Sequence, residues 1–222
     1  MMTFEGILTA EELAVIREFL AGAPFVDGKY SAAASVAASK INLQLQPGSE
    51  GEGLVGRVVI DALLRNDVFR TWAKPLHLTP PIFARYQPWM RYGAHVDSPV
   101  LGGGRPLRSD LSVTLFLSDA EDYDGGELAI EIPGGMRQVK LPAGSAFVYS
   151  TRAVHQVCEV TRGERMVAVL WVQSMIRDPH IRQTLFEMEA AITSLDEQAE
   201  IKQEVMLLQK SLSNLLRHFT EI

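Results

Sequence analysis

The chain has 222 residues, of which 47% are hydrophobic and 22% charged, and its formal net charge is −6. These values are ordinary for one globular domain with a sizeable core and an appendage, and no apolar run approaches the roughly 18 residues that cross a bilayer. No cluster of basic residues is present, so we expect no nucleic-acid partner and no membrane partner. The N-terminus lacks the basic and apolar regions of a secretory signal, and Cys158 is the only cysteine, which together favour a cytoplasmic location.

The N-terminal third of the chain has mainly helical patterns. Thr9 and Glu12 match a capping box, and an apolar stripe follows them as far as Gly22. A second helix is predicted over about residues 53–66. The Ala- and Ser-rich stretch from Ser31 to Lys40 fits either a short helix or a loop at the edge of a pocket. We expect these helices to cover one side of a sheet.

From about residue 80 to residue 174 the pattern changes to short strands. Apolar and polar side chains alternate along residues 111–118, 127–132 and 166–172, and turns containing Gly or Pro separate the runs. His77, just before this region, is expected in a loop between two prolines. Many short antiparallel strands at regular spacing predict a two-sheet barrel or jelly roll.

Helical patterns return at the C-terminus. Asp178 and Pro179 are typical of a helix start, and apolar stripes over residues 181–195 and 201–219 predict a helical hairpin with a short turn after Asp196. We therefore expect one domain over residues 1–177, with its β core at about residues 80–175, followed by a hairpin over residues 178–222. The hairpin either packs on the barrel or on itself, or it forms a homodimer interface, and the sequence leaves these alternatives open.

Two histidines and an aspartate form the strongest candidate for a metal site. His95 and Asp97 would project to the same face of a strand, because alternate side chains share a face. His155 follows several predicted strands later, which suits the opposite side of a small barrel. Two histidines and one carboxylate hold non-haem Fe(II) on one face and leave positions open for oxygen chemistry. A lone H-x-D tripeptide is common by chance, and the alternatives are a turn aspartate and a surface histidine.

Arg165 begins an alternating run in which Arg165, Val167 and Trp171 share a face. If that face points into the barrel, the buried guanidinium needs a partner, and a carboxylate held by two hydrogen bonds is the natural one. The alternative is an exposed arginine that pairs with Glu159 or Glu164.

The run from Arg85 to Asp97 resembles the prolyl/lysyl hydroxylase branch of the Fe(II)/2-oxoglutarate dioxygenases. Residues 109–119, 122–128, 139–144, 160–165 and 171–178 narrow the likeness to the bacterial PKHD-type hydroxylases, over nearly the whole chain. Two segments depart from the family pattern. Gln87-Pro88-Trp89 replaces a Gly-rich turn at the pocket lip, and Thr151-Arg152-Ala153 replaces a Ser-rich stretch before His155.

This resemblance implies a mainly β fold with flanking helices, built on a double-stranded β-helix (jelly-roll) core. It implies that His95, Asp97 and His155 bind Fe(II). It also implies that Arg165 binds the distal carboxylate of 2-oxoglutarate and that Tyr86 hydrogen-bonds the same group. Tyr92 matches a second family tyrosine, which either shapes the substrate mouth or only packs near the metal.

The resemblance further implies a dioxygenase that forms succinate and CO2 while it hydroxylates a C–H substrate, with ascorbate as an additional cofactor. Peptidyl proline or lysine, a free amino acid and an iron-related metabolite are all compatible substrates. Two alternatives from other classes are a non-enzymatic, cupin-like protein that binds or senses iron or a small molecule, and an interaction protein whose β domain has lost its activity and whose C-terminal hairpin mediates assembly. Among enzymes, a zinc hydrolase that uses the same ligands is the alternative. Succinate formation that requires Fe(II), O2 and 2-oxoglutarate distinguishes the dioxygenase from all three.

Overall fold

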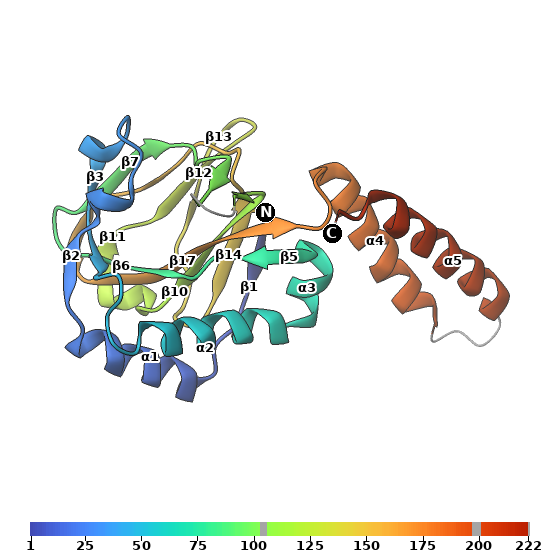
Figure 1. The fold of residues 1–222 in the computed structure, drawn as a ribbon, viewed down its shortest axis with the longest axis horizontal. Helices are drawn as coiled ribbons and strands as arrows, with labels where there is room; N and C mark the ends of the chain where they lie inside the picture. Colours follow the sequence, from blue (N-terminus) through green and yellow to red (C-terminus); the bar gives the residue numbers. More distant parts are fainter. Residues whose placement is uncertain (103–105, 197–200, 222) are drawn as a thin grey trace.

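The computed structural model describes residues 1–102, 106–196 and 201–221, and its centre consists of two facing antiparallel sheets (Figure 1). The larger sheet has the strand order β1 (Met2–Phe4), β14 (Ala146–Ser150), β10 (Leu111–Phe116), β17 (Arg165–Ser174), β6 (Ile82–Tyr86), β4 (Leu43–Leu45), β2 (Phe25–Asp27), with β5 (Pro75–Leu78) beside β17. The smaller sheet has the order β13 (Gly135–Val139), β12 (Leu128–Ile132), β15 (His155–Val157), β7 (Arg91–His95), β3 (Lys40–Ile41). These two sheets form the predicted jelly-roll core.

Two further strand pairs lie at the edges of this core: β11 (Tyr123–Gly125) with β16 (Val160–Gly163), and β8 (Val100–Leu101) with β9 (Leu107–Arg108). Short 3-10 helices occupy Gly28–Ser31, Ala37–Ser39 and Ala120–Asp122. The stretch from Ser31 to Lys40 is therefore partly helix and partly loop, and it ends in β3.

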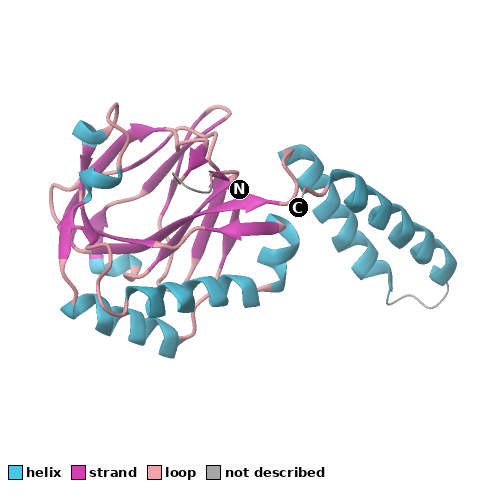
Figure 2. Ribbon diagram, viewed as in Figure 1, coloured by secondary structure: helices cyan, strands magenta, loops and turns pink. Residues whose placement is uncertain are grey.

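Three helices cover the outer face of the larger sheet (Figure 2): α1 (Ala10–Gly22), α2 (Glu52–Arg65) and α3 (Asp67–Ala73). The predicted capping box is confirmed, because the Glu12 backbone N–H donates to Thr9 Oγ1 at 3.2 Å and the Thr9 N–H donates to the Glu12 carboxylate at 2.9 Å. Apolar side chains of the helices share one buried cluster with outward-facing side chains of β10, β14 and β17. Its members include Ile16, Leu20, Val59, Leu63, Val113, Leu115, Val148 and Leu170.

Strand β10 separates this helix-covered core from the interior of the barrel. All six of its residues are buried, and Leu111, Val113 and Leu115 belong to the cluster under the helices. The alternate residues point the other way, since Phe116 belongs to the cluster between the two sheets and Ser112 and Thr114 line a cavity there. A polar cavity wall is thus built into the middle of a fully buried strand.

The C-terminal hairpin of α4 (Pro179–Asp196) and α5 (Lys202–Phe219) projects from one end of the barrel (Figure 1). It has a small apolar core of its own: Ile176, Leu185, Ile192, Val205 and Leu212. The predicted turn after Asp196 lies outside the described residues. None of the helices described is long and apolar enough to span a bilayer.

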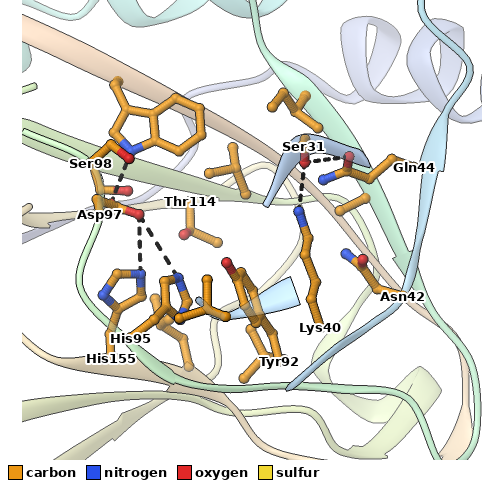
Figure 3. Close-up of a pocket in the computed structure, with 18 of the residues that line it drawn as sticks. Ser31, Lys40, Asn42, Gln44, Tyr92, His95, Asp97, Ser98, Thr114 and His155 are labelled. Carbon is orange, nitrogen blue, oxygen red and sulfur yellow. Dashed lines mark hydrogen bonds and ion pairs between the residues drawn. The ribbon is translucent and has the colours of Figure 1, made fainter. Parts of the chain in front are cut away.

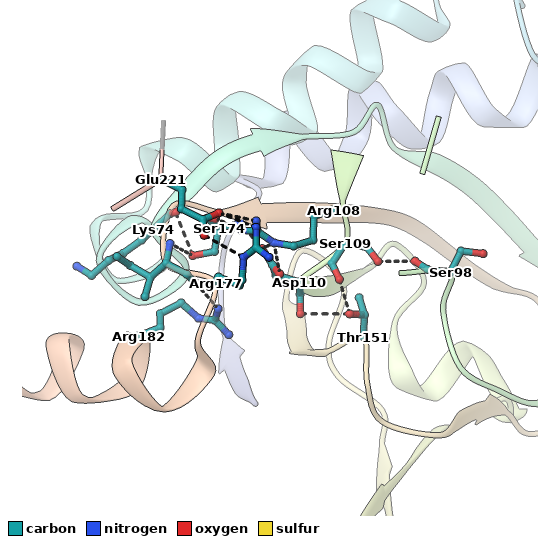
Figure 4. Close-up of polar contacts among 11 residues, drawn as sticks. Lys74, Ser98, Arg108, Ser109, Asp110, Thr151, Ser174, Arg177, Arg182 and Glu221 are labelled. Atoms are coloured by element: carbon teal, nitrogen blue, oxygen red, sulfur yellow. Dashed lines mark hydrogen bonds and ion pairs between the residues drawn. The ribbon is translucent and has the colours of Figure 1, made fainter. Parts of the chain in front are cut away.

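Polar contacts attach this hairpin to the barrel (Figure 4). Lys74, which follows α3, pairs with Glu189 of α4 at 2.7 Å. Arg108 bonds both to Asp110 at 2.8 Å and to Glu221 at 2.7 Å, and so ties the end of the chain to the sheet.

Two sequence predictions about the first eighty residues were wrong. The N-terminal third contains strands β1 to β4 as well as helices, and His77 lies in strand β5 rather than in a loop. These strands are two to four residues long. An alternation of period two has almost no length over which to appear in such strands, so periodicity does not reveal them.

Candidate active site

A cavity lies between the two sheets and is lined by side chains from both of them (Figure 3). Antiparallel pairing of β7 with β15 in the smaller sheet sets His95 directly opposite His155. Strand β17 of the larger sheet contributes Arg165, Val169 and Trp171 to the facing wall. The residues singled out in the sequence therefore meet in one interior space, although they come from distant segments.

His95, Asp97 and His155 each offer a ligand atom, and these atoms lie within 4.8 Å of one another. Oδ1 of Asp97 is 3.9 Å from Nε2 of His95 and 3.7 Å from Nε2 of His155. All three side chains are buried, and Asp97 lies just beyond the end of β7 rather than within the strand. Two imidazoles and one carboxylate that converge in this way suit Fe(II), with further coordination positions facing the cavity.

Backbone carbonyls fix the tautomer of both histidines. Nδ1 of His95 is 2.9 Å from the carbonyl oxygen of Gly93, and Nδ1 of His155 is 3.1 Å from that of Ala153. A carbonyl oxygen only accepts hydrogen bonds, so each Nδ1 carries the hydrogen and each Nε2 presents a lone pair to the cavity. Burial, together with the neighbouring His155, lowers the pKa of His95 to about 4. His95 is therefore neutral near pH 7, as a metal ligand must be.

Trp171 is a further polar residue beside His95, Asp97 and His155. Its indole Nε1 donates to Oδ2 of Asp97 at 2.9 Å, which leaves Oδ1 directed at the histidines. The alternation in the sequence placed Trp171 on the same face as Arg165 but gave no reason to connect it with Asp97.

Arg165 is the largest fully buried side chain of the core, with 1% exposure. Its Nε and Nη1 atoms have no hydrogen-bond partner among the described residues, and its guanidinium carbon lies 5.1 Å from the centre of the Tyr86 ring. Strand pairing sets Arg165 opposite Tyr86, which is also buried. A buried guanidinium with free donors in a cavity is a receptor for a carboxylate.

The exposed-arginine alternative does not hold for Arg165. Glu164 pairs with Arg85 at 3.4 Å, and Glu159 pairs with Arg91 at 2.6 Å, so neither acid is directed at Arg165. The nearby Arg162 is exposed and pairs with Asp124, as expected for a turn arginine.

Tyr92 lies against the metal-site residues. Its ring stacks on His95 with 3.8 Å between centroids and 20° between planes. Burial raises the pKa of Tyr92 to about 12, so its hydroxyl stays protonated at neutral pH. The two segments that depart from the family pattern contribute nothing to the cavity lining: Trp89 is 73% exposed, and Arg152 lies in a separate surface hollow with Asp178 and His218.

Sequence analysis missed a polar stripe that lines the cavity from β3 of the smaller sheet and β4 of the larger one. Lys40, Asn42 and Gln44 are all buried and all line the cavity, whereas the intervening Leu43 is excluded from it. The signal is the alternation of polar and apolar residues from Lys40 to Leu45, which is divided between two strands of two and three residues.

Comparisons with known proteins agree with this geometry. Residues 81–173 match the family model described as the 2OG-Fe(II) oxygenase superfamily. A PKHD-type hydroxylase from Acaryochloris marina is 42% identical over 221 residues, which cover 100% of both chains. The chain belongs to the PKHD-type hydroxylases. It is therefore an oxidoreductase of the hydroxylase class, and its cofactors are Fe(II) and the co-substrate 2-oxoglutarate.

Solved structures of hydroxylases share the fold of this PKHD-type chain. A prolyl-4-hydroxylase from Pseudomonas putida superposes with a TM-score of 0.54 and 20% identity, covering 78% of this chain and 91% of that one. A prolyl hydroxylase from Trichoplax adhaerens, in complex with a hypoxia inducible factor peptide fragment, gives a TM-score of 0.55 and 17% identity over 77% of this chain and 82% of that one. At these identities the likeness establishes the jelly-roll fold of the core.

Proposed function

We propose that this PKHD-type hydroxylase holds Fe(II) through His95, Asp97 and His155 and hydroxylates a C–H bond of its substrate. Arg165, with Tyr86 beside it, would bind the distal carboxylate of 2-oxoglutarate. The observation that carries the proposal is the juxtaposition of a metal-ligand triad and a buried guanidinium with free donors in one cavity. Peptidyl proline or lysine, a free amino acid and an iron-related metabolite are the candidate substrates.

The protein residues would bind and orient rather than transfer protons. Bound Fe(II) supplies oxygen activation coupled to decarboxylation of 2-oxoglutarate to succinate and CO2. His95, Asp97 and His155 would hold the ion, and Arg165 would orient the co-substrate beside it. The buried walls around them keep bulk water away from the reacting atoms. No protein acid or base is needed for this chemistry.

The proposal is tested by succinate formation with Fe(II), O2 and 2-oxoglutarate, screened against peptides, amino acids and iron chelators. We expect succinate from the wild-type protein and none above background from Asp97→Ala, because that variant loses the anionic ligand. Asp61→Ala removes an exposed carboxylate on α2 and is the matched control, with activity expected at the wild-type level. Full activity of Asp97→Ala at limiting iron would overturn the ligand assignment.

The hairpin core supports a division of the chain into an oxygenase domain over residues 1–177 and a C-terminal unit over residues 178–222. Exposed leucines on α5 support the proposal that this unit forms a homodimer interface. The ascorbate requirement and the cytoplasmic location expected from the sequence stay predictions.

A further inference from the structure

Lys40 is a buried cation in the wall of the proposed active site. It lies on β3 with 5% exposure, and its Nζ donates to Ser31 Oγ at 2.6 Å. Figure 3 shows its side chain beside Tyr92, in the same cavity as His95, Asp97 and His155. The ammonium group has three N–H donors, and one of them is used by Ser31.

No carboxylate of the described residues pairs with this lysine. Lysine ion pairs form at Lys29 and Lys74, but Lys40 has only the Ser31 hydroxyl. Burial lowers the pKa of Lys40 to about 8, so the group is still charged at pH 7. A buried charge without a partner is costly, and such a group is retained where a ligand supplies the partner.

The residues around Lys40 form an organised polar wall. Ser31 Oγ accepts from Lys40 and lies 2.8 Å from Gln44 Oε1, to which it donates. Both polar atoms of the buried Asn42 amide lack a partner among the described residues. The wall around Lys40 therefore contains hydrogen-bonding groups that the described residues leave unused.

Lys40 and Arg165 come from different sheets of the barrel, on β3 and β17 respectively. Arg165 is fully buried, whereas Ala33, Val96 and Ser98, which also line the cavity, are exposed. The Tyr92 ring stands between Lys40 and the triad, 5.1 Å from Lys40 Nζ and stacked on His95. Lys40 and the metal-site residue His95 thus contact the same aromatic ring.

The sum of the charges in the filled cavity also favours a substrate with a carboxylate. The charges of Fe(II), the Asp97 carboxylate, the 2-oxoglutarate dianion and the Arg165 guanidinium cancel one another. Lys40 then leaves one uncompensated positive charge in the filled cavity, and a carboxylate of the substrate would pair with it.

We propose that Lys40, positioned by Ser31, binds a carboxylate of the substrate. This inference rests on the proposed function and narrows it, because it selects a substrate with a free carboxylate close to the hydroxylated C–H bond. A free amino acid, a carboxylate metabolite and a peptide C-terminus meet that requirement, whereas the interior of a neutral peptide does not.

The test measures binding rather than turnover, on protein loaded with Zn(II) as a redox-inert metal and with 2-oxoglutarate. The probes are matched pairs: N-acetylated proline and lysine as free acids and as primary amides, and short proline peptides with a C-terminal carboxylate or amide. Ligand-observed NMR gives the dissociation constant of each probe. We expect the acids to bind wild-type protein at least about tenfold more tightly than the amides, as a charged hydrogen bond provides. The two families of probe distinguish a free amino acid from a chain terminus.

Three variants and one control variant test the role of Lys40. Lys40→Met should abolish the preference for acids, and Lys40→Arg should restore part of it. Lys29→Met is the matched control, because it removes an exposed lysine from the same segment, and it should keep the full preference. Ser31→Ala keeps the charge but removes its positioning contact, and should weaken the acid preference even if Lys40→Met proves unable to fold.

Three results would overturn the inference. Equal binding of acids and amides to the wild-type protein would remove the need for a carboxylate receptor. An unchanged acid preference in folded Lys40→Met would assign Lys40 a structural role. A loss of 2-oxoglutarate affinity in Lys40→Met as large as that in Arg165→Ala would assign Lys40 to the co-substrate. Failure of the wild-type protein to bind 2-oxoglutarate at all would instead contradict the proposed function, and the same titrations reveal it.

Discussion

The indole of Trp171 and the carboxylate of Asp97 are joined by a hydrogen bond of 2.9 Å that decides which carboxylate oxygen faces the two histidines. Trp171 comes from the larger sheet, whereas Asp97 follows a strand of the smaller one. The bond therefore ties the two sheets together at the proposed metal site. Outer contacts of this kind orient a ligand and set its affinity for the ion.

Replacing Trp171 by Phe tests that role. The variant keeps the aromatic ring but loses the donor, so the Asp97 carboxylate is free to rotate. We expect metal affinity to fall about tenfold or more while the fold is retained. Titration with Co(II), followed by its visible absorption, measures the change, and Trp89→Phe, which alters an exposed tryptophan, serves as the control. Wild-type affinity in Trp171→Phe would show that packing alone holds Asp97 in place.

The second prediction concerns Arg165. In Arg165→Ala the distal carboxylate of 2-oxoglutarate loses its charged partner, so the co-substrate concentration for half-maximal succinate formation should rise by roughly tenfold to a hundredfold. Binding of Fe(II) should stay close to wild type. Arg162→Ala removes an exposed arginine of β16 and should leave both quantities unchanged. Equal succinate production by Arg165→Ala and wild type at low co-substrate concentration would refute the assignment.

The sequence predicted the metal-ligand candidates because H-x-D, a distant histidine and a following arginine are local patterns with a known chemical use. It could not predict the Trp171–Asp97 bond, since that contact depends on how the two sheets face each other. It missed Lys40 for a different reason. β3 is only two residues long, so the alternation from Lys40 to Leu45 does not by itself show a strand, and the pairing of Lys40 with Tyr92 of β7 is needed to place it beside the metal site.

The helices that cover the larger sheet also show that local signals are predictable from sequence and that shared boundaries are not. The capping box at Thr9 is a local signal, and it marked the start of α1 correctly. Asn66, in contrast, both ends α2 and caps α3 by accepting from Phe69 N–H at 2.8 Å. Because one residue has both roles, no gap separates the apolar patterns of the two helices, and α3 has no separate signal in the sequence.

A third prediction follows from the depressed pKa of Lys40. Its folded-state pKa of about 8 lies below the unfolded value of 10.5, so the unfolded chain binds more protons between these pH values. The charged lysine therefore destabilises the ligand-free fold below pH 8, and this penalty is lost as pH rises from about 8 to 10.5.

Urea unfolding of wild type and Lys40→Met measures this penalty. At pH 7 the variant should be more stable by on the order of 2 kcal/mol, and the difference should shrink as pH approaches 10. Lys29→Met should show no such trend, since Lys29 is half exposed. A stability difference that stays constant with pH would mean that Lys40 contributes through its packing and not through its charge.

The last prediction concerns the hairpin as a homodimer interface. Two positions of the predicted apolar stripe on α5, Leu208 and Leu215, remain 40% and 36% exposed although Val205 and Leu212 are buried inside the hairpin. Leu208 and Leu215 are seven residues apart and lie on the same side of the helix. If this side faces a second copy, Leu208→Glu/Leu215→Glu places charges in an apolar contact and should produce a monomer.

Light scattering after size-exclusion chromatography gives the mass directly. The wild type should elute with twice the chain mass of 24.5 kDa, and the double variant with that of one chain. Leu54→Glu introduces the same charge at an exposed leucine of α2, which does not belong to the hairpin core, and should leave the dimer intact. A monomeric wild type at every concentration would contradict the interface. In that case the exposed leucines of α5 would belong to the solvent-facing side of a hairpin that packs only on itself.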